Sequence, residues 1–129
     1  HGEEPKLIKV ETPACLLGSI TALVRSEMDE SDSGTLAVIT PDQYVKPLSE
    51  SFKASSIEHG LVDDGALTSQ VTIVPVDLVK GLEIDIAIVV EPSEILNSAT
   101  NGERSLYVAL TRATRRLIII HAEDLPSVL

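Results

Sequence analysis

The sequence predicts an α/β fold, with a mainly parallel sheet flanked by helices on both faces. Aliphatic runs with the composition of strands alternate along the chain with segments of helical periodicity. The runs are continuously apolar, which is typical of parallel strands buried on both faces. The chain has 129 residues, of which 43% are hydrophobic and only 2% aromatic, so its core is expected to be aliphatic. We expect one domain over residues 1–129, excised from a longer chain because it begins at His1 rather than Met.

Five strands are predicted from short runs rich in Val, Ile and Leu, each bounded by polar residues, Gly or Pro. The polar segment Ser55–Gln70 contains two glycines and is interpreted as a loop with a short strand near Leu61. The five predicted strands are Lys6–Val10, Thr35–Thr40, Val71–Val76, Ile86–Val90 and Leu117–Ile120.

The first helix is predicted to begin after Thr12-Pro13 and to run to about Met28. Threonine is a favourable N-cap, and proline fits the first helical position. Apolar residues then recur at helical spacing. The single cysteine, Cys15, lies in this stretch and is expected to be buried as a small hydrophobic side chain. One cysteine permits neither a disulfide nor a Cys/His metal cluster.

A second Thr-Pro pair, Thr40-Pro41, opens the next helical segment, where Pro47 is expected to kink the helix or to delay its regular part. The last helix is predicted from Thr100 and Glu103, which have the spacing of a capping box. Its apolar face is expected to consist of Leu106, Ala109, Leu110 and Ala113.

The charge and composition limit the function classes. A formal net charge of −10 argues against strong nucleic-acid binding by this chain alone, because Lys and Arg supply that affinity. The acidic groups Asp63-Asp64 and Asp29, Glu30 and Asp32 lack the glycine and closing glutamate of a calcium loop, so no metal site is predicted. No signal peptide and no membrane-spanning apolar run is found, which favours the cytoplasm and no membrane partner.

Residues 77–85 join two predicted strands and carry the sequence Lys80-Gly81-Leu82-Glu83. Ligands of open α/β sheets bind beyond the strand ends, where such a turn is expected to lie. Gly81 permits close backbone approach or a positive φ. Lys80 and Glu83 are candidates to bind an anion and a hydroxyl group.

Three arginines, Arg112, Arg115 and Arg116, cluster at the end of the last predicted helix. One interpretation is favourable placement of cations at a helix C-terminus, and the spacing alone favours it. The other is a site that binds an anionic ligand.

Two segments resemble motifs of the UvrD/Rep/PcrA-like superfamily-1 helicases. Lys80 to Glu83, followed by a hydrophobic strand, is similar to motif V, which reads Lys-Gly-Leu-Glu-Phe in that family. Tyr107 to Ala113 reads Tyr-Val-Ala-Leu-Thr-Arg-Ala and resembles motif VI throughout. The motifs occur in the family's order. The resemblance implies a RecA-like fold and, more narrowly, the C-terminal (2A) motor domain of a helicase or translocase.

The resemblance also implies roles for four residues. Arg112 matches the arginine finger that reaches the γ-phosphate across a cleft between two RecA-like domains, a contact that can contribute about 10³–10⁵ in rate. Glu83 matches a glutamate that approaches the ribose, and Gly81 would let the turn approach the nucleotide. Lys80 matches a lysine near both nucleotide and nucleic acid, although a solvated turn lysine is almost as good an interpretation.

Motif V departs from the family at two positions. Many members have Thr-x-His-x-x-Lys-Gly, but Pro75 and Asp77 occupy the threonine and histidine positions. Proline has no N–H to donate, and an aspartate would repel phosphate, so contact with nucleic acid through this turn is weakened. The run from Val74 to Glu83 most resembles the HelD branch, whose members act on RNA polymerase.

The chain contains no Gly-x-x-x-x-Gly-Lys-Ser/Thr loop to hold phosphates. The resemblance therefore implies that ATP and Mg²⁺ are bound in the full-length protein, together with an N-terminal RecA-like domain of the same parent chain. This piece alone is expected to be inactive as an ATPase, and DNA is expected to bind the full-length protein. The alternative is an acidic protein-docking module, for example on RNA polymerase, with vestigial nucleotide motifs.

Overall fold

Six strands form a single sheet in the order β1-β6-β5-β2-β4-β3 in a computed structural model of the chain, which describes residues 5–30, 34–62, 69–98 and 101–127. Every neighbouring pair is parallel. The predicted α/β fold with a parallel sheet is therefore confirmed, including the short strand near Leu61. The strands are β1 (Lys6–Lys9), β2 (Leu36–Thr40), β3 (Gly60–Leu61), β4 (Val71–Pro75), β5 (Ile84–Val90) and β6 (Ala113–His121).

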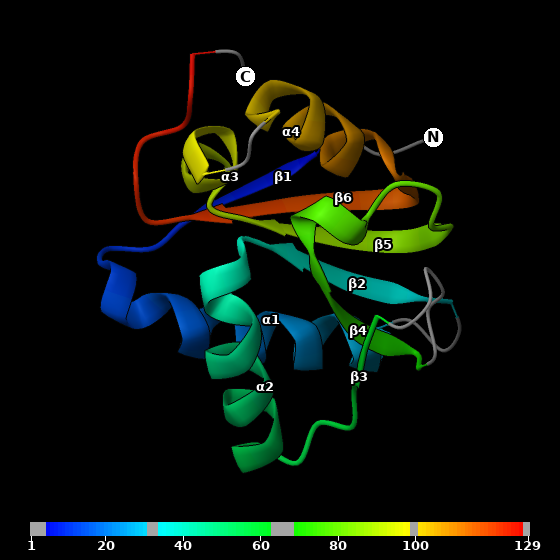
Figure 1. Cartoon of the computed structure of the whole chain (residues 1–129). Coiled ribbons are helices and arrows are strands. Elements are labelled where there is room, and N and C mark those ends of the chain that lie inside the picture. The colour runs from blue at the N-terminus through cyan, green and yellow to red at the C-terminus, as the bar shows by residue number, and fades with distance from the viewer. Residues whose placement is uncertain (1–4, 31–33, 63–68, 99–100, 128–129) are drawn as a thin grey trace.

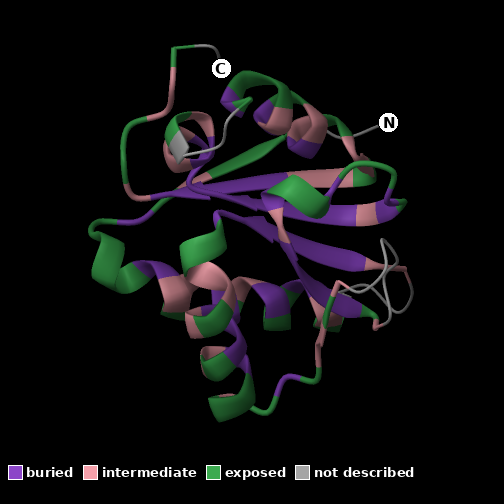
Figure 2. Ribbon diagram, in the orientation of Figure 1, coloured by how far each residue is buried: buried purple, intermediate pink, exposed green. Residues whose placement is uncertain are grey.

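Helices cover both faces of the sheet (Figure 1). Helices α1 (Leu16–Glu30) and α2 (Val45–Ala54) lie on one face. Helices α3 (Pro92–Ser98) and α4 (Gly102–Thr111) lie on the other, with the 3₁₀ segment η3 (Val76–Leu78). Figure 2 shows that β2, β4, β5 and the carboxyl half of β6 form the buried centre between these two layers, whereas most of β1 is exposed. Because both faces are covered, the strands are apolar along most of their length, as the continuous aliphatic runs predicted.

The core consists of two apolar clusters, one on each face of the sheet, because successive strand residues point to opposite faces. Residues 86, 88 and 90 of β5 contact α1 and α2, whereas residues 87 and 89 contact the α3–α4 layer. The alternation breaks between Ile84 and Ile86, where the β5–β6 register is irregular. The largest fully buried side chains are Phe52, Leu16, Ile20, Ile39, Leu48, Ile73, Ile84, Ile88, Ile95, Leu106, Ile118 and Ile120.

The first helix begins later than the sequence predicted. Residues Pro13–Cys15 form the 3₁₀ segment η1, and the α-helix starts at Leu16. Thr12 makes no capping hydrogen bond to the backbone; its hydroxyl lies 3.4 Å from the Cys15 sulfur. Cys15 is exposed, so the expectation of a buried cysteine is wrong. The 3₁₀ segment faces solvent, and the chain reaches the core only at Leu16.

Pro47 delays the second helix without kinking it, which is one of the two predicted outcomes. The 3₁₀ segment η2 (Asp42–Tyr44) precedes α2, and Pro47 is the third residue of α2. The first four N–H groups of a helix have no intrahelical acceptor, so the N–H that proline lacks is not missed there.

Two helices, rather than one, connect β5 to β6. Helix α3 was not predicted. The N-cap of α4 is Asn101, so Glu103 is the second helical residue and the predicted capping box is wrong; Thr100 lies outside the described residues. Ala113, predicted on the apolar face of the helix, begins β6 and still packs against the α4 cluster.

We predict that Gly34→Ala destabilises the domain by about 1–3 kcal/mol. Gly34 has φ +111°, and an added Cβ would lie 2.7 Å from Asp85 Oδ2. The matched control is Gly18→Ala in α1, where a Cβ would meet nothing within 4 Å. This control is expected to stabilise by about 0.4–1 kcal/mol, because alanine restricts the unfolded chain. Urea unfolding measures both, and equal effects of the two substitutions would contradict the prediction.

Candidate functional site

The connection from β4 to β5 is unusually short for a parallel crossover. Eight residues, 76–83, lead from the end of β4 to the start of β5, and β2 lies between these strands. The strand registers require the chain to return about 20 Å along the strands and to move about 10 Å sideways. An eight-residue α-helix would span only about 12 Å. The connection therefore consists of one 3₁₀ turn and a second tight turn rather than an α-helix, and it packs on the α3–α4 face of the sheet.

A tight turn ends this connection and separates buried from exposed side chains. The Leu82 N–H donates to the Val79 carbonyl at 3.2 Å, and Gly81 has φ +85°, as the third position of a type II turn requires. Val79 and Leu82 are buried in the α4 cluster. Lys80, Gly81 and Glu83 are exposed. The turn is thus anchored by two apolar side chains and presents the three predicted site residues to solvent.

The structure brings Arg112 beside this turn. Leu106 and Ala109 of α4 pack in the same cluster as Val79 and Leu82. Arg112 is the C-cap of α4, and Ala113 pairs with Ile84 in the β5–β6 register. Glu83 and Arg112 therefore precede paired residues at the starts of adjacent strands.

The predicted site residues lie at the amino ends of β5 and β6, not at the carboxyl ends where ligands of open α/β sheets usually bind. The short crossover explains the difference. It leaves the carboxyl end of β4 at Pro75 and runs back to the amino end of β5. The Lys-Gly-Leu-Glu segment is the last part of the crossover, so it lies at that amino end.

Asp85 links three strands at the same edge and was not singled out from the sequence. Its carboxylate accepts the Thr35 N–H at 2.8 Å and the Thr114 hydroxyl at 3.4 Å. Its own N–H donates to the Thr35 hydroxyl at 3.1 Å. Asp85 also sits at the β5–β6 irregularity, where Ile84 pairs with Ala113 but Ile86 pairs with Arg116. A charged residue inside an aliphatic run was the available sequence signal.

The three arginines have different surroundings. Arg115 and Arg116 lie on β6 rather than at the helix end, so the helix-terminus interpretation can apply only to Arg112. Arg116 forms an ion pair of 3.6 Å with Glu27 of α1, whose side chain is only 3% exposed. Arg112 is half-buried, and its Nε has no hydrogen-bond partner among the described residues. An unsatisfied buried donor costs about 1–3 kcal/mol and calls for a functional explanation.

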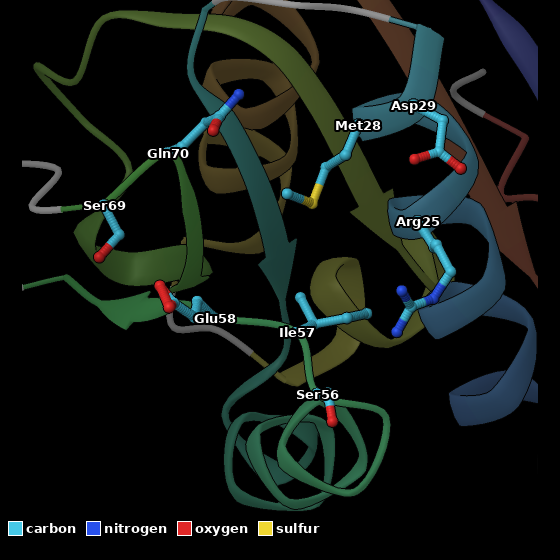
Figure 3. Close-up of a pocket in the computed structure, with 8 residues that line it drawn as sticks. All are labelled: Arg25, Met28, Asp29, Ser56, Ile57, Glu58, Ser69 and Gln70. Atoms are coloured by element: carbon cyan, nitrogen blue, oxygen red, sulfur yellow. The ribbon is translucent and has the colours of Figure 1, made fainter.

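A surface pocket of about 510 Å³ lies away from these residues (Figure 3). Its lining side chains come from the last turns of α1, the segment after α2 and the residues before β4. Arg25, which lines it, already donates a hydrogen bond to the Ser55 carbonyl. None of the predicted site residues is among the lining residues, so the pocket gives no support to a nucleotide site there. The lining residues are Arg25, Met28, Asp29, Ser56, Ile57, Glu58, Ser69 and Gln70.

Comparison with known proteins establishes the family. Residues 26–124 match the family described as the UvrD-like helicase C-terminal domain, and the chain belongs to this family. The match includes the Lys-Gly-Leu-Glu turn and the Tyr-Val-Ala-Leu-Thr-Arg-Ala segment. A search of curated proteins found no significant match.

Solved structures of helicases and related ATPases share the fold. The C-terminal domain of a possible DNA helicase from Lactobacillus plantarum WCFS1 superposes with a TM-score of 0.79 at 22% identity, covering 99% of this chain and 80% of that one. The Sulfolobus solfataricus SWI2/SNF2 ATPase core in complex with dsDNA has a TM-score of 0.66 at 13% identity, covering 94% of this chain. The Pyrococcus furiosus Hef helicase domain has 0.57 at 13%, covering 84%.

These likenesses confirm the predicted RecA-like fold. The chain spans only 28% of the SWI2/SNF2 chain and 26% of the Hef chain. Among the described residues, no helix is long and apolar enough to cross a membrane.

We predict opposite consequences for stability when Arg116 and Arg112 are each replaced by methionine. Arg116→Met leaves the buried Glu27 carboxylate without its cation and should destabilise by about 1–3 kcal/mol, less than a fully buried pair because Arg116 is 29% exposed. Arg112→Met removes a donor that lacks a partner and should change stability by less than about 0.5 kcal/mol or raise it. Thermal and urea unfolding test the pair, and a larger loss for Arg112→Met than for Arg116→Met would contradict this assignment.

Proposed function

We propose that this domain supplies one half of an ATP site to a superfamily-1 helicase or translocase, with Arg112 as the arginine finger. One observation carries the proposal. The turn that resembles motif V and the segment that resembles motif VI converge at one edge of the sheet through the Ile84–Ala113 pairing. Membership of the UvrD-like C-terminal family supports the same reading.

Each proposed contact follows from the position of the side chain. Arg112 lies at the end of α4 with an unpartnered Nε, and a guanidinium binds phosphate oxygens through its fork of donors. Glu83 is exposed at the start of β5, where its carboxylate can accept ribose hydroxyls. Gly81 has no side chain, so the backbone of the turn can approach a nucleotide closely at this position. Lys80 is the exposed cation of the turn and complements the nucleotide's negative charge.

These residues fit a nucleotide better than they fit a metal ion. The proposed contacts come from two cationic side chains, Lys80 and Arg112, and a single carboxylate, that of Glu83. Phosphate and ribose suit this donor set. We propose that Mg²⁺ and the phosphate-binding loop are supplied by an N-terminal RecA-like domain of the parent chain, across the cleft from this domain.

The contact with nucleic acid is proposed to be weak in this domain and to rest on the rest of the parent protein. Pro75 ends β4 at the carboxyl edge of the sheet, and Asp77 is exposed two residues later. Neither offers a donor or a positive charge to a phosphate. The same two departures favour the HelD branch and, with it, an RNA polymerase partner in the cytoplasm.

A second candidate function is an acidic docking module with vestigial nucleotide motifs. The net charge of −10 favours it, since an acidic surface complements a basic protein face. It makes a different demand on Arg112, because a docking module does not need an arginine finger.

We expect Arg112→Ala in the parent protein to lower kcat for ATP hydrolysis by about 10³–10⁵. Arg112→Lys should also be impaired, because an ammonium lacks the planar fork of donors. The matched control is Arg104→Ala, which removes an exposed arginine from the first turn of the same helix. Steady-state ATPase assays with thermal unfolding as a check on folding make the test. Activity within tenfold of the wild type in a folded Arg112→Ala protein would favour the docking module instead.

The isolated 129-residue chain is expected to hydrolyse no ATP in the presence of Mg²⁺ and to bind DNA with a Kd weaker than about 10⁻⁴ M at physiological salt. No hydrolysis is expected because these 129 residues contain no Gly-x-x-x-x-Gly-Lys-Ser/Thr loop to hold phosphates. Weak DNA binding is expected because the chain is acidic and has Pro75 and Asp77 in motif V. Fluorescence polarisation with labelled single-stranded and duplex DNA measures the binding. Micromolar binding that weakens steeply with salt would contradict this expectation and show that the domain itself binds DNA.

A further inference from the structure

Three glutamates converge at the carboxyl edge of the sheet, at the opposite end of β5 from Glu83. Glu91 follows β5, Glu94 lies in the first turn of α3, and Glu123 follows β6. One carboxylate oxygen of each lies within 4.8 Å of one oxygen of each of the other two. Sequence spacing did not suggest this group, because the residues come from two separate connections.

The group occupies the place in the topology where open α/β sheets bind ligands. After β2 the chain continues through α2 on one face, and after the neighbouring β5 it continues through α3 on the other. The two connections diverge to opposite faces at the carboxyl ends of these strands, and open α/β sheets bind ligands beside such a divergence. Tyr44, from the β2 side, donates a hydrogen bond of 2.7 Å to Glu94 Oε2, and Gln43 donates to Glu94 Oε1. Side chains that follow β2 thus hold the Glu94 carboxylate of α3 in position.

The buried Glu91 carboxylate provides independent evidence that this group binds a ligand. Glu91 is 0% exposed, and its backbone has the left-handed φ of +47°, which is uncommon outside glycine. Its Oε1 accepts the Glu123 N–H at 3.3 Å, whereas Oε2 is buried without a hydrogen-bond partner among the described residues. Burial raises the pKa of the Glu91 carboxyl above its ordinary value. The ion pairs found in the described part of the chain, Lys9–Asp124 and Arg116–Glu27, do not involve the three glutamates.

We propose that Glu91, Glu94 and Glu123 bind a hard divalent cation, Ca²⁺ or Mg²⁺. The donors are all carboxylate oxygens, which these ions prefer, and the set contains no sulfur and no imidazole ligand that would favour a softer metal. A cation would satisfy the unpartnered Glu91 oxygen and neutralise three carboxylates crowded at one point. This site is separate from the proposed ATP site, which lies at the amino ends of β5 and β6, and it stands whether or not Arg112 acts on ATP.

Tyr44 makes a direct binding test possible. Tb³⁺ replaces Ca²⁺ at oxygen sites, and its luminescence is sensitised by a nearby tyrosine. The chain has no Trp and two Tyr residues, of which Tyr44 contacts Glu94 and Tyr107 is 69% exposed on α4. Titration of the 129-residue chain with Tb³⁺ at physiological salt should give saturable emission excited through tyrosine. Ca²⁺ or Mg²⁺ should compete it away.

Matched variants separate this site from the general acidity of the surface. Glu91→Gln and Glu94→Gln should each weaken Tb³⁺ binding by about tenfold or more, since each replaces a charged carboxylate ligand by a neutral amide. Glu103→Gln, which removes an equal charge from exposed α4, should not. Tyr44→Phe should abolish most of the emission, whereas Tyr107→Phe should preserve it. Thermal unfolding gives a second readout, in which Ca²⁺ or Mg²⁺ raises the wild-type Tm relative to EDTA but leaves Glu91→Gln unchanged.

Three results would overturn the proposal. One is the lack of both sensitised emission and a cation-dependent Tm. Another is emission that Glu103→Gln weakens as much as Glu91→Gln does, which would indicate diffuse binding to an acidic surface. A cation-independent rise in Tm for Glu91→Gln, without any Tb³⁺ site in the wild type, would likewise mean that the buried carboxylate is only a strained structural residue.

Discussion

The register that pairs Ile84 with Ala113 is the constraint on which the candidate site depends. It joins the ends of two connections that run independently, one over the sheet from β4 and one through α3 and α4. Val79 and Leu82 pack against Leu106 and Ala109 above this pair. A slip of one residue would turn Ile84, which packs in the same cluster, toward the other face of the sheet. Glu83 and Arg112, which precede the paired residues, would then no longer lie side by side at the starts of β5 and β6.

Asp85 and the arginines show how polar groups stabilise that edge. Asp85 connects the starts of β2, β5 and β6 by hydrogen bonds at the point where the ladder is irregular. Arg116 forms an ion pair with the buried Glu27 of α1, on the α1–α2 face of the sheet. Arg112, by contrast, has a buried Nε without a hydrogen-bond partner among the described residues. A cluster that looks uniform in sequence therefore consists of residues with different functions.

The two ends of the sheet have contrasting chemistry. The amino edge presents Lys80, Glu83 and Arg112, a set suited to phosphate and ribose. The carboxyl edge presents carboxylates, among them the buried Glu91. The segment from Pro75 to Ile84 spans both edges within eight intervening residues.

The sequence by itself determined the parallel α/β class, the approximate positions of most strands and the Gly81 turn, because these depend on local composition and short spacing. The four candidate site residues rest on the resemblance to family motifs and stay predictions. Helix starts were less predictable, as η1 and the Asn101 cap show, since several residues can cap one helix. Only the tertiary structure decided which edge carries the turn, how the arginines divide their roles, and that Glu91, Glu94 and Glu123 meet. Those outcomes depend on which strands pair across long stretches of chain, and no local pattern encodes the pairing.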